Sequence, residues 1–192
     1  MFKFLRILLS IGVLLLGVLS TANAALEMRL GGLAYYDMEL KITWAADANI
    51  NGVHSWWDQM AWASGLAIGG VVSGWRLPNA DVNGNGSSES GFDNEMYFLY
   101  WNEGITAATP GVFSNVQSFV YWSGTELVSD PPYAFIFFFN SGEYLDELKS
   151  HHRFAWAVHD GDVALIPEPE MYAMMVLGLA VLLGFGRLRQ QS

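Results

Sequence analysis

The sequence predicts an α+β domain over its central part, residues 25–165. β-prone runs lie at both ends of this part, and two segments with helical spacing lie between them. The first β-prone runs are residues 34–37 and 41–44. Three more follow the helical patterns, at residues 119–122, 133–139 and 153–158. No internal repeat of fixed period interrupts this order. We therefore expect a single α+β domain over residues 25–165.

Two helices are expected between these runs. Residues 55–64 place apolar side chains at helical spacing, with Ser55 in position to cap the first turn and Asp58 three residues later. Residues 93–101 repeat the helical spacing and carry acidic side chains in the first turn. The segment 81–91 is polar and rich in Gly and Ser, so we expect it to form a surface loop.

The charge of this central part is strongly negative. Residues 25–165 contain five basic and 17 acidic side chains, which gives a net charge near −12. Such a charge argues against nucleic acid and against anionic membrane surfaces as partners.

Cysteine is absent, so the domain must be stable without disulfides. All eight Trp residues fall within it, and each large aromatic side chain buries on the order of 150–250 Å². We expect an aromatic-rich core.

The N-terminus has the pattern of a signal peptide over residues 1–24. A short basic start precedes an apolar run at residues 7–19, and Ala22 and Ala24 form a small-x-small cleavage site for signal peptidase. An uncleaved anchor is the alternative. Cleavage would leave a mature chain that begins near Ala25.

The C-terminus combines a short motif, an apolar segment and a basic end. These parts are Pro167, Glu168 and Pro169, then residues 171–186, then Arg187 and Arg189. The 16 apolar residues of the middle part span about 24 Å as a helix, somewhat less than a bilayer core. With the Arg residues inside and the domain outside, the topology obeys the positive-inside rule.

Residues 166–189 resemble the PEP-CTERM sorting signal of Gram-negative bacteria. The resemblance implies that an integral-membrane exosortase cuts at or near Pro167-Glu168-Pro169 and discards the transmembrane helix. The sorting signal then spans residues 166–192, and its contact with the inner membrane is transient. A permanent C-terminal anchor with an incidental Pro-Glu-Pro is the alternative.

The domain resembles a second family, the Lcl C-terminal-like domain of unknown function, over residues 30–163. The residues that carry this resemblance are Trp44, Trp75-Arg76-Leu77-Pro78, Glu95-Met96 and Tyr121-Trp122-Ser123. The family is considered similar to the C-type-lectin and formylglycine-generating-enzyme fold, so the resemblance implies two helices against a twisted antiparallel sheet.

The Trp-Arg-Leu-Pro element has the properties of a structural corner. Pro78 disfavours helix at Leu77, and Trp75 and Leu77 can alternate inward. Arg76 between them can pair with an acid or lie over an aromatic ring, while a binding role for Arg76 is the alternative.

No catalytic constellation stands out, and we expect a non-catalytic domain. The oxygen-activating relatives of the resembled fold use cysteines or a histidine cluster, whereas this chain has no Cys and only four His. His151 and His152 are adjacent and poor co-ligands, and Ser123 lacks a nucleophile elbow. Asp146 and Glu147 are interpreted as an exposed acidic turn. An enzyme on the same fold is the alternative hypothesis, and a concave pocket with converging polar groups would favour it.

One metal hypothesis concerns the polar loop. Asp81, Asn83 and Asn85 match the opening half of a calcium loop, but the twelfth position is Phe92 instead of a bidentate Glu. A calcium site completed by Glu89 or Asp93 and a plain polar loop both remain open, and no other cofactor is expected.

Together these observations predict an exported protein of the cell envelope, outer surface or extracellular matrix. Its lectin-like domain would bind exopolysaccharide or another matrix component through the 81–91 loop and nearby exposed aromatic side chains. A structural coat component without a small ligand is the alternative.

Overall fold

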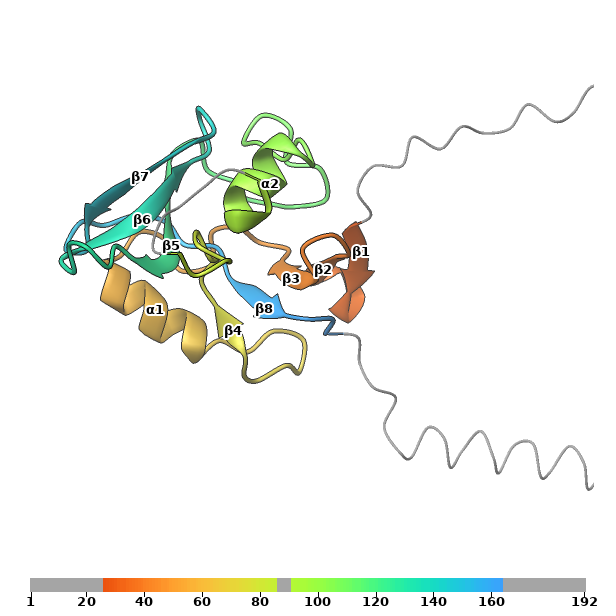
Figure 1. The fold of residues 1–192 in the computed structure, drawn as a ribbon. Coiled ribbons are helices and arrows are strands. Elements are labelled where there is room, and N and C mark those ends of the chain that lie inside the picture. The colour runs from red at the N-terminus through yellow and green to blue at the C-terminus, as the bar shows by residue number, and fades with distance from the viewer. Residues whose placement is uncertain (1–25, 86–90, 164–192) are drawn as a thin grey trace, which may run out of the picture.

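The computed structural model describes residues 26–85 and 91–163, which form two antiparallel sheets and two α-helices (Figure 1). The α+β class is therefore confirmed. The signal peptide and the sorting tail predicted above lie outside the described residues. Within the described ranges, neither helix is long and apolar enough to cross a membrane.

The larger sheet has five strands in the order β1-β2-β3-β8-β4. Their bounds are β1 Leu26–Arg29, β2 Ala34–Asp37, β3 Ile42–Ala45, β8 Val158–Asp160 and β4 Trp75–Arg76. In register, Asp37 of β2 lies opposite Ile42 of β3, and Ile42 lies opposite Asp160 of β8. The last strand of the described chain therefore inserts beside the first hairpins.

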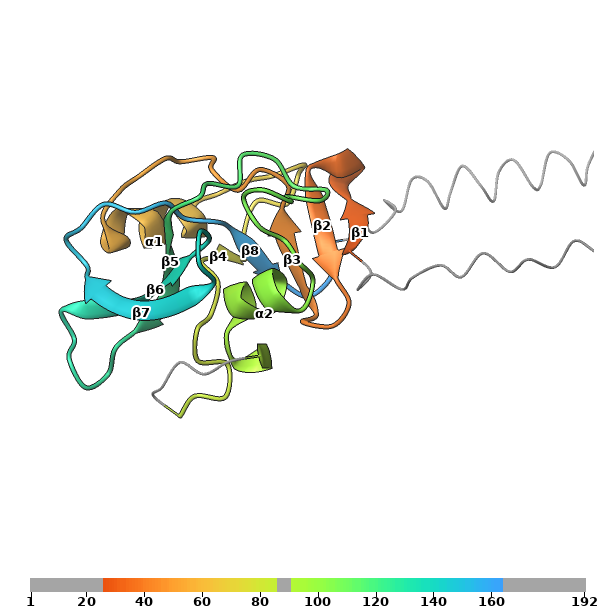
Figure 2. The same ribbon diagram turned by 90° about the horizontal axis from the view of Figure 1, so that it is seen from above.

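The smaller sheet has three strands in the order β5-β6-β7, with bounds β5 Val120–Glu126, β6 Tyr133–Phe138 and β7 Glu143–Leu148. The segment before β8 joins this sheet to the larger one. The amide of Trp122 donates to the carbonyl of Phe154 at 2.9 Å, and the amide of Phe154 donates to Val120 at 3.2 Å. Figure 2 shows this segment crossing from the end of β7 to β8.

Two α-helices lie on different sides of the sheets, α1 (Trp56–Ser64) and α2 (Glu95–Trp101) (Figures 1 and 2). Short 3₁₀ turns occur at η1 (Leu30–Gly32) and η2 (Gly91–Asp93). Ser55 caps α1 as predicted, because its side chain accepts the amide of Asp58. Helix α2 starts two residues later than predicted, because Asn94 is extended and its side chain caps the helix.

The core is rich in aromatic side chains, as expected. Trp44, Trp122 and Trp156 are fully buried. The ring of Trp156 lies edge-on to Trp44 at 5.2 Å and to Phe113 at 4.9 Å between centroids. Tightly packed rings supply the apolar contact that a domain without disulfides needs.

Two expectations for the second half of the domain were wrong. Residues 153–157 are not part of a regular strand, because Arg153 bridges to His54 while Phe154 bonds β5, and only β8 continues as a ladder. The acidic turn expected at Asp146 and Glu147 is strand β7. This strand lies at the edge of its sheet and is largely exposed, so it lacks the apolar alternation that marks half-buried strands.

Candidate functional site

The corner element around Arg76 is tied into the domain by buried side chains and ion pairs. Trp75 and Leu77 point inward and are 2% and 1% exposed. The Arg76 guanidinium forms a two-bond pair with Glu95, with N–O distances of 2.8 and 2.9 Å, and its Nε donates to Asp160 at 2.9 Å. Although burial acts in the opposite direction, these carboxylates raise the pKa of Arg76 further above its ordinary value. The guanidinium is thus held by acids from α2 and β8.

The other residues that carry the Lcl resemblance are buried in the same way. They are Trp44, Met96, Tyr121, Trp122 and Ser123, each at or near zero exposure. The Ser123 hydroxyl donates to the carbonyl of Phe135 at 2.9 Å, so it serves the β5–β6 pairing. The carbonyl of Pro78 accepts the amide of Gly124 at 2.7 Å and ties the corner to β5. These residues build the domain, and a substrate has no access to Ser123.

An open pocket of about 600 Å³ lies beside the corner. Its polar lining includes Lys41, Arg76, Asn79, Glu95 and Thr125. Most of these groups hold one another: Glu95 also accepts the amide of Asn79 at 2.7 Å, and Thr125 donates to the Asn79 side chain at 2.7 Å. The hydrogen bonds run along the wall of the pocket, which makes it a weak candidate for a catalytic centre.

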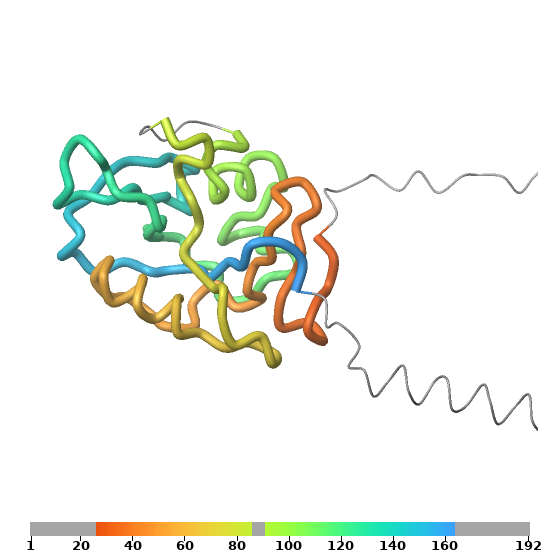
Figure 3. Tube along the Cα trace, turned by 60° about the horizontal axis from the view of Figure 1, so that its bottom comes forward, coloured from red at the N-terminus to blue at the C-terminus, as the bar shows by residue number. Residues whose placement is uncertain are grey.

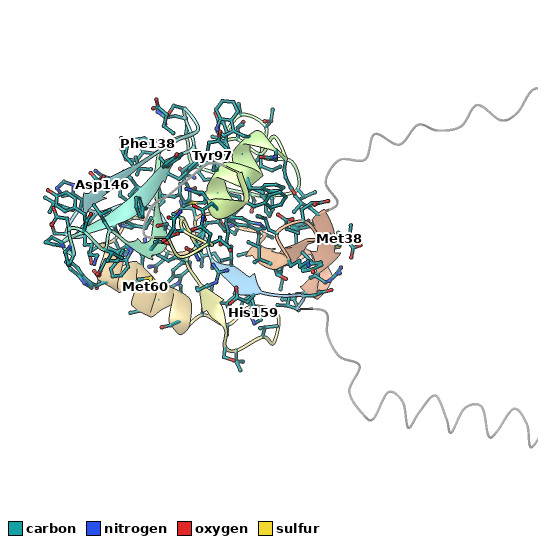
Figure 4. The ribbon with its side chains drawn as sticks, in the orientation of Figure 1. Met38, Met60, Tyr97, Phe138, Asp146 and His159 are labelled. Atoms are coloured by element: carbon teal, nitrogen blue, oxygen red, sulfur yellow. The ribbon has the colours of Figure 1, made fainter. Side chains whose placement is uncertain are left out.

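The histidine and acidic residues considered for catalysis lie on β7 and in the turn after it. His151 and His152 are exposed in the turn after β7, and the His151 Nδ1 lies 2.8 Å from Glu147. Burial opposes the shift, but Arg153 and His151 lower the pKa of Glu147. Asp146, the neighbour of Glu147, faces solvent (Figure 4). Across residues 26–85 and 91–163, no group of three or more His, Asp or Glu side chains is placed to hold a metal ion.

The calcium candidates form a chain of side chain to backbone bonds. The side chains of Asp81 and Asn83 both accept the amide of Asn85 at 2.9 Å. The Asp93 carboxylate accepts the amide of Asn83 at 2.9 Å. This is how Asp and Asn stabilise a turn without a metal. Glu89, the fourth candidate ligand, lies outside the described residues, so the calcium hypothesis stays a prediction.

The strongest candidate site is a shallow aromatic groove of about 340 Å³ between α2 and β7. It is lined by Tyr97, Trp101, Gly142, Glu143, Tyr144 and Leu145. Tyr97 lies on the side of α2 that faces the smaller sheet (Figure 4), and its ring centroid is 6.0 Å from Tyr144 and 6.2 Å from Trp101. We call this site the α2–β7 groove.

Trp101 is held as a fixed platform in this groove. Trp101 is 56% exposed, although its indole Nε1 donates a hydrogen bond to the carbonyl of Gly142 at 2.9 Å. Gly142 has a φ of +76°, and a Cβ there would lie 2.7 Å from the Trp101 ring and 2.6 Å from Tyr100. Only glycine lets the β6–β7 turn approach the indole so closely. The rest of the indole is thereby presented to solvent in one orientation.

Comparison with known proteins finds no relative of the chain. No model of a protein family matches the chain, and no curated protein matches it.

Sequence reasoning missed the α2–β7 groove because it missed β7. Two signals were present: Tyr97 and Trp101 stand four residues apart on a helix, and Asn140-Ser141-Gly142 has the composition of a turn, which the structure shows. Neither signal shows which strand follows the turn, nor that Trp101 stays exposed when Trp44 and Trp156 do not.

Proposed function

We propose that the domain is a non-catalytic, lectin-like module that binds polysaccharide through the α2–β7 groove. The observation that carries the proposal is Trp101, a large aromatic ring that is more than half exposed and yet fixed by a hydrogen bond and by a close glycine turn. A preordered exposed ring loses little conformational entropy when a ligand covers it.

The chemistry of the groove suits sugar rings. The C–H faces of a pyranose pack on aromatic rings, while its hydroxyls need hydrogen-bond partners at the edge. Tyr97, Glu143 and Tyr144 line the groove together with Trp101, so their phenolic hydroxyls and carboxylate are the candidate partners for sugar hydroxyls. A shallow groove open along its length accepts part of a polymer as readily as a small saccharide.

The charge of the groove narrows the class of polysaccharide. Glu143 lines it, Asp146 follows on the same strand, and the domain as a whole is strongly acidic. Anionic polymers such as polyuronates would be repelled. Neutral or amine-bearing glycans are therefore the expected ligands.

The proposal includes export and a lectin-like fold. The signal-peptide pattern and the tail that resembles a PEP-CTERM signal support processing by signal peptidase and exosortase, which would place the domain in the cell envelope or the extracellular matrix. Two helices with antiparallel sheets support the likeness to the C-type-lectin and formylglycine-generating-enzyme fold.

Binding of the full chain in detergent to a neutral glycan panel, an amine-bearing panel and a polyuronate panel tests the proposal. We expect neutral or amine-bearing glycans to bind, and Trp101→Ala to weaken the affinity roughly tenfold or more. Trp57→Ala is the matched control, because Trp57 is 55% exposed but lies on α1, away from the groove. If no glycan panel and no secreted polysaccharide bound, the proposed binding function would be wrong. If both variants lost the same affinity, the α2–β7 groove would not be the binding site.

A further inference from the structure

A pair of buried carboxyl groups outside the groove has no use in the proposed function. The first is Asp37, at the end of β2, which is fully buried. Its Oδ1 accepts the amides of Glu39 and Leu40 at 3.0 and 2.9 Å and so closes the turn between β2 and β3. Its Oδ2 is also buried but has no hydrogen-bond partner within the described residues.

The second carboxyl group belongs to Glu103, just past the end of α2. The backbone there is fixed by caps, since the amide of Glu103 donates to Phe98 at 3.3 Å and that of Ile105 donates to Leu99 at 3.1 Å. Both side-chain oxygens of Glu103 are buried, and neither has a hydrogen-bond donor in residues 26–85 or 91–163. The carboxyl group also follows the negative end of the helix dipole, which disfavours its ionised form.

The two carboxyl groups lie within hydrogen-bonding reach of each other. Two ionised carboxylates in a buried contact repel strongly, and each buried oxygen without a donor adds a desolvation cost. One proton held between them removes a charge and supplies the missing donor at the same time. A carboxyl–carboxylate hydrogen bond is also stronger than one between neutral groups.

The surroundings decide which group carries the proton. The charged groups that act on Glu103 are Asp37 and Glu39, both acidic. Burial raises the pKa of Asp37 above its ordinary value, while the amides of Leu40 and Glu39 and the nearby indole of Trp44 act in the opposite direction and favour its ionised form. Glu103 has no such support, so the proton resides on Glu103.

We propose that Asp37 and Glu103 form a buried proton-binding site, in which the Glu103 carboxyl group donates a hydrogen bond to Oδ2 of Asp37. The site joins the β2–β3 turn to the end of α2, two segments that are far apart in the sequence. When the proton leaves, the two carboxylates repel and this joint loses its hydrogen bond.

The site gives the domain a defined dependence on pH. Burial, with the charges of Asp37 and Glu39, raises the pKa of Glu103 from its ordinary 4.5 to about 8 in the folded state. Between these two values the folded chain holds a proton that the unfolded chain has released. The stabilising effect is complete below the lower value and is lost as the pH rises to the upper one, by up to about tenfold in the unfolding constant per pH unit.

Urea unfolding of the full chain in detergent micelles, from about pH 5 to about pH 9, tests the proposal. Tryptophan fluorescence is a suitable probe, because all eight Trp residues lie in the described domain. We expect the unfolding constant of the wild type to rise by at least about tenfold over this range. Glu103→Gln is expected to remove most of the rise, whereas Asp146→Asn, which removes an exposed carboxyl group on β7, is expected to leave it unchanged.

A second measurement covers the case in which Glu103→Gln does not fold. Carboxyl-detected NMR of the wild type is expected to show one Glu carboxyl group that titrates near pH 8, and Asp37→Asn is expected to move that titration to lower pH. A flat wild-type profile with no such carboxyl group, or an unchanged slope in a folded Glu103→Gln, would overturn the proposal. A wild-type profile that shifts with divalent cations or a chelator would overturn it in favour of a metal ion.

Discussion

Arg76 joins three parts of the domain through one side chain. Its five N–H donors are used by Glu95, by Asp160 and by the carbonyl of Leu77. The two acids differ sharply in environment, because the Glu95 side chain is 6% exposed and that of Asp160 is 76% exposed. The same guanidinium therefore offers a comparison of a buried and an exposed ion pair.

We expect Glu95→Gln to destabilise the domain by about 2 kcal/mol or more, because it leaves the guanidinium without its buried counter-charge. Asp160→Asn is the control and is expected to cost less than about 1 kcal/mol, since solvent screens the exposed pair. Chemical denaturation of both variants measures the difference. Equal losses would show that burial does not govern the strength of these pairs.

Gly142 provides a second test at this scale. Gly142→Ala combines the strain of a positive φ with a Cβ that overlaps the rings of Trp101 and Tyr100. We therefore expect the free energy of unfolding to fall by about 2 kcal/mol and glycan binding to weaken. Gly161→Ala is the control, because Gly161 has a φ of +73° but nothing within 4 Å of an added Cβ. Gly161→Ala is expected to lower the free energy of unfolding by only about 1 kcal/mol and to bind glycans as the wild type does. Denaturation and glycan titration measure the two effects, and identical results for both variants would argue against a tight contact in the groove.

Helix α2 serves two purposes at once. Met96 and Leu99 on one side are fully buried in the core, while Tyr97 and Trp101 on the other side line the groove. The stability of this helix therefore sets the geometry of the α2–β7 groove. Its N-cap is Asn94, whose side chain accepts the amide of Tyr97 at 3.0 Å.

We expect Asn94→Ala to destabilise the domain by about 1–2 kcal/mol, because the amide of Tyr97 loses its acceptor in a buried position. Asn94→Asp keeps a capping oxygen and is expected to retain most of the stability. Thermal melts of the two variants make the comparison. A similar fall in both would show that the cap contributes little.

The elements that could be predicted from the sequence are those specified by local signals. Both helices carry caps and helical spacing within about ten residues, and β2, β3, β5 and β6 are rich in β-branched and aromatic residues. The exposed edge strands β1 and β7 were missed because neither has a buried face to pattern its sequence. The pairing of Asp37 with Glu103 could not be foreseen, since no local rule brings two carboxyl groups together.

At the scale of the whole molecule, the sorting function proposed for the two ends of the chain can be tested. If the tail is a sorting signal, replacing Pro167-Glu168-Pro169 with alanines is expected to keep the chain in the membrane fraction with its full C-terminal mass. The wild type is expected to lose the residues after the motif. Mass spectrometry and fractionation measure both, and the N-terminus near Ala25 serves as an internal control because signal-peptide cleavage does not need the motif. Identical masses for the two chains would support a permanent anchor.

The ends of the described domain lie close together. Leu26 of β1 is opposite Asp37, Asp37 is opposite Ile42, and Ile42 is opposite Asp160, so three strand spacings of about 4.8 Å separate the first strand from the last. An ion pair between Arg29 and Asp162 holds them there, and both ends of the described domain lie on the same side of it in Figures 1 and 3.

Because both ends of the described domain lie at the five-stranded sheet, any attachment through these ends would act on that side of the domain. A membrane that carried both terminal segments would meet one end of the five-stranded sheet, and the three-stranded sheet would project away from it.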